Sequence, residues 1–180
     1  GVATGSVKFL RVVESPEKRF FSPAAWGGQG QHAPAMNWHN FENKRILGTV
    51  PVEADGSAHF ETPPNTYVFF QLLDAEGRMI QSMRSGILLQ PGEAQGCVGC
   101  HDERTGSSRP PRHDMLAMRR APSKLDGWRG PARTFSFMTE VQPVLTKHCV
   151  RCHDFQHVSS NKIVLAADRD VFFNAAYEEL

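Results

Sequence analysis

The amino-acid sequence predicts an α+β fold, with an antiparallel β-sandwich in the first half of the chain followed by small, mostly helical segments. Short runs rich in β-branched and aromatic residues, separated by turn signals, occupy residues 7–95. From residue 135 onward, apolar side chains instead recur at helical spacing. The change of period therefore separates a β part from a helical part.

The β part is expected to contain about six short strands. They are residues 7–13, 46–52, 58–61, 67–73, 79–83 and 87–89. Two pairs of them enclose the turn signals Asp55-Gly56 and Asp74-Ala75-Glu76-Gly77, so each pair is expected to form a hairpin. Successive hairpins imply an antiparallel sheet, and a small sandwich of the immunoglobulin-like or transthyretin-like kind fits this pattern. The expected core residues are Phe9, Val50, Phe60, Phe69 and Leu72.

The helical part is expected to begin with a short helix before residue 149. Its apolar and aromatic positions are Phe137, Val141, Leu145 and His148, and Pro143 suits the first helical turn. Further along, residues 162–165 resemble a short extended run and residues 169–180 resemble a helix.

Composition and charge exclude two classes of protein. The chain has 180 residues, 40% of them hydrophobic, and a formal net charge of +1, which does not suggest a nucleic-acid binder. No apolar run approaches the roughly 18 residues that a membrane-spanning helix needs. The opening residues lack the features of a secretory signal, so we expect any signal to have been removed or to lie upstream.

All four cysteines occur in Cys-x-x-Cys-His motifs, at residues 97–101 and 149–153. This is the attachment signature of c-type haem, in which two thiols form thioethers with the vinyl groups and the adjacent histidine binds the iron. The sequence therefore predicts two covalently bound haem c groups. The residues expected to attach them are Cys97, Cys100, Cys149 and Cys152, with His101 and His153 as the proximal iron ligands.

A four-cysteine zinc site is the main alternative, because two Cys-x-x-Cys pairs also form zinc ribbons. Zinc ribbons usually separate the pairs by about 15–20 residues. Here 48 residues, 101–148, lie between Cys100 and Cys149, and a histidine follows each pair. Short-loop disulfides or a thioredoxin-like redox pair fit less well, because neither pair lies between a strand and a helix.

The distal iron ligands are not identified by a motif. His113 is the first candidate, because it lies between the two motifs. The other candidates are Met115, Met118, His148 and His157, together with His32, Met36 and His39 of a Gly-, Pro- and Asn-rich loop at 22–43. A loop of this length is often functional, and the competing interpretation is a surface loop packed on the sandwich. For His113 the competing interpretation is an ordinary surface histidine.

We expect three regions. Residues 1–96 form the β-sandwich with its loop 22–43, residues 97–133 hold the first haem motif and a basic linker, and residues 134–180 hold the second haem segment. Residues 104–133 contain eight Arg or Lys against two acids, which either bind haem propionates or form a solvated basic face. Only His157 follows the second motif as a conventional ligand, and it lies too close to His153, so this haem segment is expected to be truncated.

Several strings resemble the middle domain of the hydrazine synthase alpha subunit family. They are GTVPVEADGSAHF at 48–60, FQLLD at 70–74, MRSG at 83–86 and PGE at 91–93, which runs into the first haem motif. Residues around the second motif resemble the start of that family's C-terminal haem domain, namely Phe137, Val141, Gln142, Pro143, Val144, Leu145, Phe173, Asn174, Tyr177 and Leu180.

This resemblance implies a β-sandwich with one haem, a helical segment with a second haem, and residence outside the cytoplasmic membrane within a larger polypeptide. In the family's catalytic member a tyrosine just after the first motif belongs to an unusual active-site haem. Residues 102–108 contain no tyrosine here, so the resemblance extends to the fold and the haems but not to the reaction.

The haem motifs and the resemblance are consistent with two functions. The first is electron transfer by a periplasmic or otherwise extracytoplasmic di-haem c-type cytochrome domain. The alternative is a haem enzyme subunit of hydrazine synthase-like type, in which a five-coordinate iron binds small nitrogen or oxygen compounds. The expected partners are a redox protein or further domains of a larger chain, with no nucleic acid and no transmembrane segment.

Overall fold

The computed structural model describes residues 3, 5–17, 44–83, 85–98, 114–127, 129–157, 162–170 and 173–180. Two compact units divide the chain, Gly1–Thr134 and Phe135–Leu180. Each is described by itself below. No helix among the described residues is long and apolar enough to cross a membrane.

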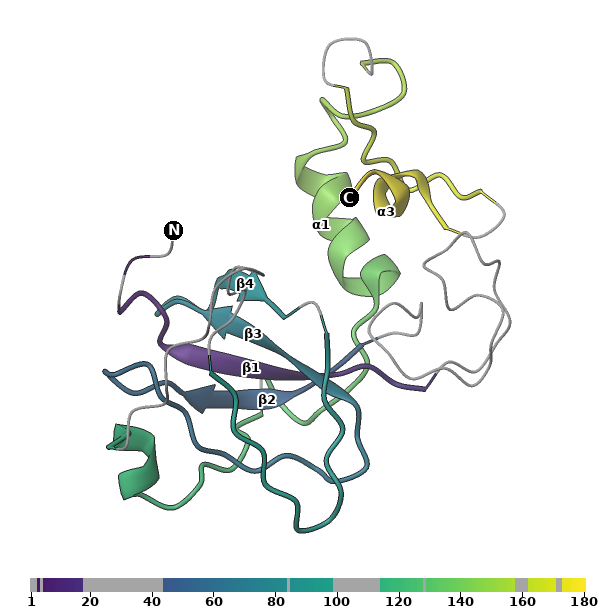
Figure 1. The fold of residues 1–180 in the computed structure, drawn as a ribbon. Coiled ribbons are helices and arrows are strands. Elements are labelled where there is room, and N and C mark those ends of the chain that lie inside the picture. The colour runs from purple at the N-terminus through teal and green to yellow at the C-terminus, as the bar shows by residue number, and fades with distance from the viewer. Residues whose placement is uncertain are drawn as a thin grey trace, which may run out of the picture. The chain divides into compact units, whose positions relative to one another are not determined.

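The first unit is built on one four-stranded antiparallel sheet (Figure 1). Its strands are β1 (Phe9–Glu14), β2 (Arg45–Pro51), β3 (Val68–Leu73) and β4 (Met79–Ser82), in the order β2-β1-β3-β4. The predicted antiparallel sheet is confirmed. The predicted hairpin at 67–83 also forms, because the Asp74 carboxylate accepts hydrogen bonds from the N–H groups of Glu76 at 3.0 Å and Arg78 at 2.8 Å.

The first strand is the centre of this sheet, since it pairs with both β2 and β3. Its consecutive residues Val12 and Val13 are both buried, with 0% and 3% of their surface exposed. Successive side chains of a strand point to opposite faces, so both faces of the sheet are covered at this position. The rest of the core is apolar as well, and includes Val50, Val68, Phe69 and Leu73.

Two of the predicted strands are reduced to single bridges. Residues 58–61 contribute only a parallel bridge from Phe60 to Ser123, and residues 87–89 only a bridge from Ile87 to Val68. The predicted hairpin around Asp55-Gly56 was therefore wrong, because β2 pairs with β1 and not with residues 58–61. The described residues thus form one sheet, and bridged irregular segments stand where the prediction had a second sheet.

Of the five predicted core residues, two are buried, two are half-buried and one is exposed. Val50 and Phe69 are buried, whereas Phe60 and Leu72 are half-buried. Phe9 is 39% exposed because it is the first residue of β1, at the end of the sheet. Phe60 still packs edge-on against Phe70, with ring centroids 5.6 Å apart.

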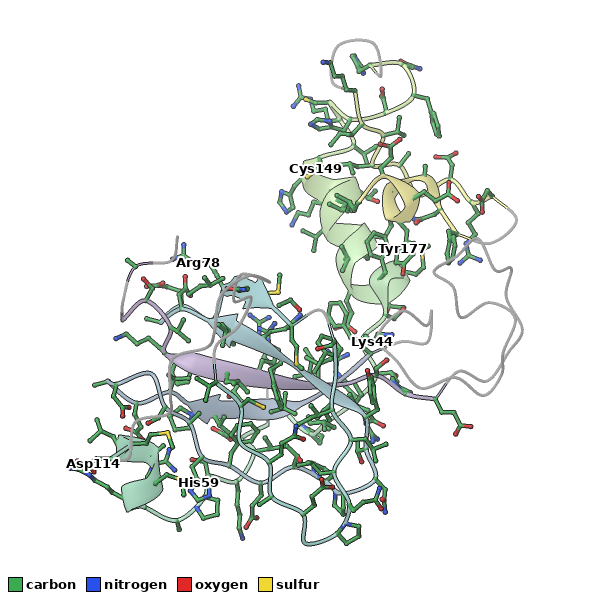
Figure 2. All side chains as sticks on the ribbon, in the orientation of Figure 1. Lys44, His59, Arg78, Asp114, Cys149 and Tyr177 are labelled. Atoms are coloured by element: carbon green, nitrogen blue, oxygen red, sulfur yellow. The ribbon has the colours of Figure 1, made fainter. Side chains whose placement is uncertain are left out.

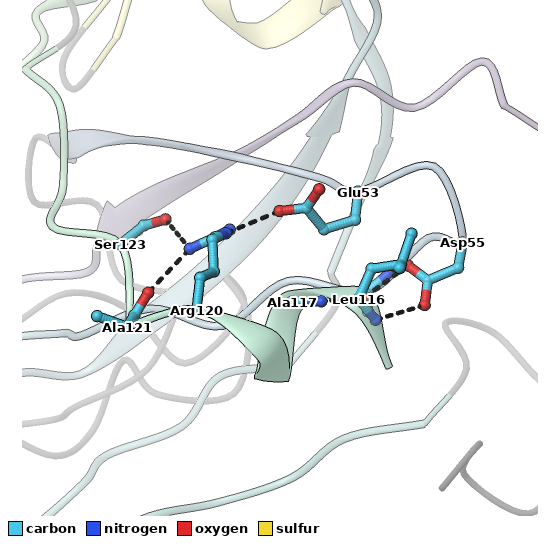
Figure 3. Close-up of polar contacts among 8 residues, drawn as sticks. Glu53, Asp55, Leu116, Ala117, Arg120, Ala121 and Ser123 are labelled. Atoms are coloured by element: carbon cyan, nitrogen blue, oxygen red, sulfur yellow. Dashed lines mark hydrogen bonds and ion pairs between the residues drawn. The ribbon is translucent and has the colours of Figure 1, made fainter. Parts of the chain in front are cut away.

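The basic stretch after the first haem motif returns to this sheet. A 3₁₀ helix, η1 (Leu116–Arg119), begins beside the turn at 53–57: Asp55 Oδ2 accepts from the Leu116 N–H at 2.9 Å, and Ser57 Oγ accepts from the Ala117 N–H at 3.1 Å (Figure 3). Hydrogen bonds from the Ser57 hydroxyl and the Leu116 N–H lower the pKa of Asp55 to about 2. Residues 114–117 are thereby held against the sheet unit.

An ion pair continues this contact. Arg120 Nε lies 2.8 Å from Glu53 Oε1, and Arg120 Nη1 donates to Ser123 Oγ at 2.7 Å (Figure 3). Further along, the backbones of Thr49 and Asp126 exchange two hydrogen bonds of 2.8 and 3.0 Å. Part of the predicted linker therefore covers the outer edge of β2.

The second unit contains a single turn of π-helix, η2 (Phe137–Val141), followed by α1 (Gln142–His148) and α3 (Ala175–Glu179). The helix predicted before residue 149 is confirmed, and Pro143 lies in its first turn, where the missing N–H costs nothing. The helix predicted for 169–180 is shorter, because Asn174 caps α3 by accepting from the Tyr177 N–H at 3.1 Å. Tyr177 also packs against Phe137, with ring centroids 5.1 Å apart.

Candidate haem-attachment site

The second motif forms a tight turn directly after α1 (Figure 2). The helix continues into it, since the N–H groups of Cys149 and Val150 both donate to the Leu145 carbonyl, at 2.8 and 3.0 Å. The Cys149 carbonyl then accepts from the N–H groups of Cys152 and His153, each at 3.0 Å. These are the i+3 and i+4 bonds of a helical turn, and residues at this spacing lie on one side of it. The backbone of the motif therefore has the spacing that places Cys149, Cys152 and His153 along one side of a turn.

Both cysteines of this motif are at least partly accessible. Cys149 is half-buried, Cys152 is exposed, and neither forms a disulfide. A short-loop disulfide is therefore not formed at this motif. Reduced, accessible thiols one turn apart are what thioether formation with the two vinyl groups of a porphyrin requires.

His153 has an unusual environment for an iron ligand. Its Nδ1 atom is buried and has no hydrogen-bond partner among the described residues. Histidine ligands usually donate this N–H to a carbonyl or carboxylate, which fixes the ring. Here backbone contacts hold the residue: its N–H donates to the Cys149 carbonyl at 3.0 Å, and its carbonyl accepts from the Leu165 N–H at 2.8 Å.

Exposed apolar side chains occur close to the motif in the sequence. Val144 on α1 is 56% exposed, and Phe155, two residues after His153, is 57% exposed. A porphyrin presents a large apolar surface, so these side chains fit a haem that covers them. The residues of this unit are therefore compatible with a covalently held haem.

A buried pair of side-chain amides joins the start of α1 to the start of α3. Gln142, the first residue of α1, is 3% exposed, and Asn174, the cap of α3, is 1% exposed. Asn174 Nδ2 donates to Gln142 Oε1 at 2.7 Å, and Gln142 Nε2 donates to the Leu165 carbonyl at 3.1 Å. Both residues are among those that resemble the hydrazine synthase family, but their sequence context predicts no role for them. An asparagine before a short helix is a recognisable cap, whereas nothing local distinguishes a buried glutamine.

The first motif is described only in part. Cys97 is exposed, whereas Cys100 and His101 lie outside the described residues. The chain leading to Cys97 is attached to β3, because Ile87 and Val68 exchange backbone hydrogen bonds of 2.8 and 2.9 Å. The predicted Pro91-Gly92 turn also forms, since the Glu93 N–H donates to the Gln90 carbonyl at 3.1 Å.

The distal-ligand candidates divide in the same way. His113 and the loop 22–43, with His32, Met36 and His39, lie outside the described residues. Met118 is 60% exposed on η1, Met115 is half-buried, and His148 is exposed. The His157 ring is engaged with Asp154, with 2.7 Å between Nδ1 and Oδ1, and this hydrogen bond lowers the pKa of Asp154. The prediction that His157 is unsuitable rests on its position four residues after His153.

The zinc alternative receives no support from the described part of the chain. Within it, no three or more His, Cys, Asp or Glu side chains are grouped so as to hold a metal ion. A haem needs only one protein ligand next to two thiols that bond to the porphyrin, so the turn at 149–153 meets its requirement without such a group.

Residues 5–102 match the protein family described as hydrazine synthase alpha subunit middle domain. The chain belongs to this family. The resemblance seen in the sequence is thereby confirmed. The match ends just beyond the first haem motif, and its description names no haem.

The hydrazine synthase relatives support this assignment over different lengths. The chain is 25% identical over 107 residues to the hydrazine synthase subunit alpha of Kuenenia stuttgartiensis, which covers 56% of this chain and 13% of that protein. A solved structure of Kuenenia stuttgartiensis hydrazine synthase has the same fold over 99% of this chain, with a TM-score of 0.54 and 19% identity. The chain spans 30% of that solved chain.

Proposed function

We propose that this chain is a haem-carrying part of a hydrazine synthase alpha-like enzyme subunit, located outside the cytoplasmic membrane, that acts on small nitrogen or oxygen compounds. The proposal includes one covalent haem c at each Cys-x-x-Cys-His motif. It is supported by the family membership and, at the level of atoms, by the turn at 149–153, where the Cys149 carbonyl accepts from both Cys152 and His153.

Each residue of that turn has a defined part. Cys149 and Cys152 supply the sulfur atoms of two thioethers, and His153 supplies an imidazole on the same side of the turn. A bound haem supplies one-electron redox chemistry and, where one axial position is open, a site for a small ligand. Val144 and Phe155, which are both exposed and apolar, would exclude water from a bound ring by apolar contact.

Electron transfer remains the second candidate, and one observation favours it. No tyrosine occurs at 102–108, where the family's catalytic member has one. The two tyrosines of this chain have other surroundings. The Tyr67 ring lies so close to Gly86 that an added Cβ there would be 2.6 Å from it, and Tyr177 packs on Phe137 and Phe173. The haems would then relay electrons to a redox partner or to further domains of a larger chain.

Two measurements on the exported protein test these proposals. Intact mass after acid–acetone extraction counts the covalent haems, and two are expected to remain on the polypeptide. Release of haem into the organic phase would contradict covalent attachment. The ferrous visible spectrum is then recorded with and without carbon monoxide. A response indicates an open iron position and supports the enzyme subunit, whereas no response from either haem supports electron transfer.

A further inference from the structure

Two buried amide side chains link α1 to α3 in the second unit. Gln142 begins α1 and Asn174 caps α3, 32 residues later in the chain. Their hydrogen-bonding groups are well used: Gln142 Nε2 donates to the Leu165 carbonyl and to Thr146 Oγ1, and Gln142 Oε1 accepts from Asn174. Burying two primary amides costs free energy unless they are paired, so this pair specifies one arrangement of the two helices and the segment between them.

The path from this pair to the haem motif is short. Gln142 binds the carbonyl of Leu165, and the N–H of the same residue donates to the His153 carbonyl at 2.8 Å. Leu165 is 6% exposed, and its neighbours Val164 and Ala166 are buried as well. Any displacement of Leu165 therefore acts directly on the backbone of His153.

The imidazole has no comparable restraint of its own. Its Nδ1 atom has no acceptor among the described residues, although such an acceptor normally sets the ring orientation of a histidine ligand. Its restraints from the described residues are therefore backbone contacts: its N–H donates to the Cys149 carbonyl within the motif, and its carbonyl accepts from Leu165 outside it. This makes the buried amides relevant to the iron and not only to the fold.

We propose that Gln142 and Asn174 are positioning residues that, through the backbone of Leu165, set the orientation of His153 as an axial ligand of the second haem. The inference rests on the proposed attachment of that haem at residues 149–153. It does not place either amide in contact with the haem.

The test uses the haem-loaded protein with Cys97→Ala and Cys100→Ala, so that only the second haem contributes to the spectra. Gln142→Met keeps the length of the side chain and removes its hydrogen bonds. Asn174→Ser keeps a hydroxyl that can cap α3 but removes the donor to Gln142. The matched control is Val164→Ala, which opens a cavity beside Leu165 without removing a hydrogen bond.

Two signals are measured: hydrogen exchange of the Leu165 N–H and the electron paramagnetic resonance g-values of the oxidised haem. Gln142→Met is expected to speed the exchange roughly tenfold, because the net free energy of one lost hydrogen bond corresponds to about a factor of ten in an equilibrium constant. It is also expected to shift the g-values. Asn174→Ser is expected to shift both in the same direction but less. Val164→Ala is expected to lower thermal stability with unchanged g-values.

The outcomes separate the two proposals. If the mass shows no haem on residues 149–153, the proposed attachment fails. If the haem is bound and both amide variants leave the exchange and the g-values unchanged, the positioning role is refuted. The same follows if Val164→Ala shifts the g-values as much as Gln142→Met, because general loosening of the unit would then explain the effect. A Gln142→Met protein that does not fold leaves Asn174→Ser to decide.

Discussion

Replacing Gly48 with alanine should detach the segment that follows the first haem motif from the sheet. Gly48 is a buried residue of β2 with a φ of +154°, a backbone conformation that other residues rarely adopt. An added Cβ would lie 2.6 Å from the backbone oxygen of Asp126 and 3.0 Å from Leu125 Cβ. Ordinary contact begins at 3.4 Å, so the 125–126 backbone must retreat by 3.4 − 2.6 = 0.8 Å.

Such a shift weakens the two hydrogen bonds between the backbones of Thr49 and Asp126, which measure 2.8 and 3.0 Å. Each contributes about 1 kcal/mol to the free energy of unfolding. The strained backbone conformation adds about 1–2 kcal/mol. Gly48→Ala should therefore lower the free energy of unfolding of the first unit by about 3–4 kcal/mol.

Gly77→Ala is the matched control. Gly77 also has a positive φ, +77°, but an added Cβ there meets nothing within 4 Å. It should lose only the conformational part, about 1 kcal/mol. Urea unfolding followed by circular dichroism gives both free energies, and hydrogen exchange of the Asp126 N–H reports the local contact. Equal losses in the two variants, with the Asp126 N–H still protected in Gly48→Ala, would refute the steric argument.

Three further predictions concern Asp55, the second haem motif and His157. The pKa of Asp55 is lowered to about 2, so its contact with the Leu116 N–H should persist above the ordinary carboxyl pKa and be lost as the pH falls toward 2. The loss should appear as a change in the Leu116 amide resonance between pH 4 and 2. The same change should be absent in Asp55→Ala. Cys149→Ala with Cys152→Ala should lower the intact mass by one haem, and loss of both haems would show that the two sites fold together. His157→Ala should leave the spectrum of the second haem unchanged, because His157 lies only four residues after the proximal His153 and cannot reach the opposite face of the porphyrin; a change of spin state would identify it as a ligand after all.

Local features of the sequence were sufficient for several elements. The hairpin from 67 to 83 follows from two apolar, strand-forming runs around a turn in which the Asp74 carboxylate accepts from nearby backbone N–H groups. The helix before Cys149 follows from apolar spacing and from Pro143 in its first turn. Both features depend on contacts within a few residues, and such contacts are encoded next to one another in the chain.

Long-range pairing was less accessible. The hairpin expected around Asp55-Gly56 formed its turn, but β2 paired with β1, and residues 58–61 were left with one bridge to Ser123. The turn residues instead bind the start of η1, since Asp55 and Ser57 accept hydrogen bonds from backbone N–H groups 61 and 60 residues further along. Local propensity limits which residues can form a strand but does not select its partner, because the partner depends on which apolar faces meet.

The sequence by itself determined the chemistry of the second motif. Cysteine, cysteine and histidine at positions 149, 152 and 153 have the i, i+3 and i+4 spacing of one helical turn, and the structure folds them into such a turn. Only the tertiary structure decided what supports that turn. The Gln142–Asn174 pair and the bond from Leu165 to His153 join residues that are 32 and 12 positions apart, and such contacts arise from burial of both partners in one packed unit, which no local pattern records.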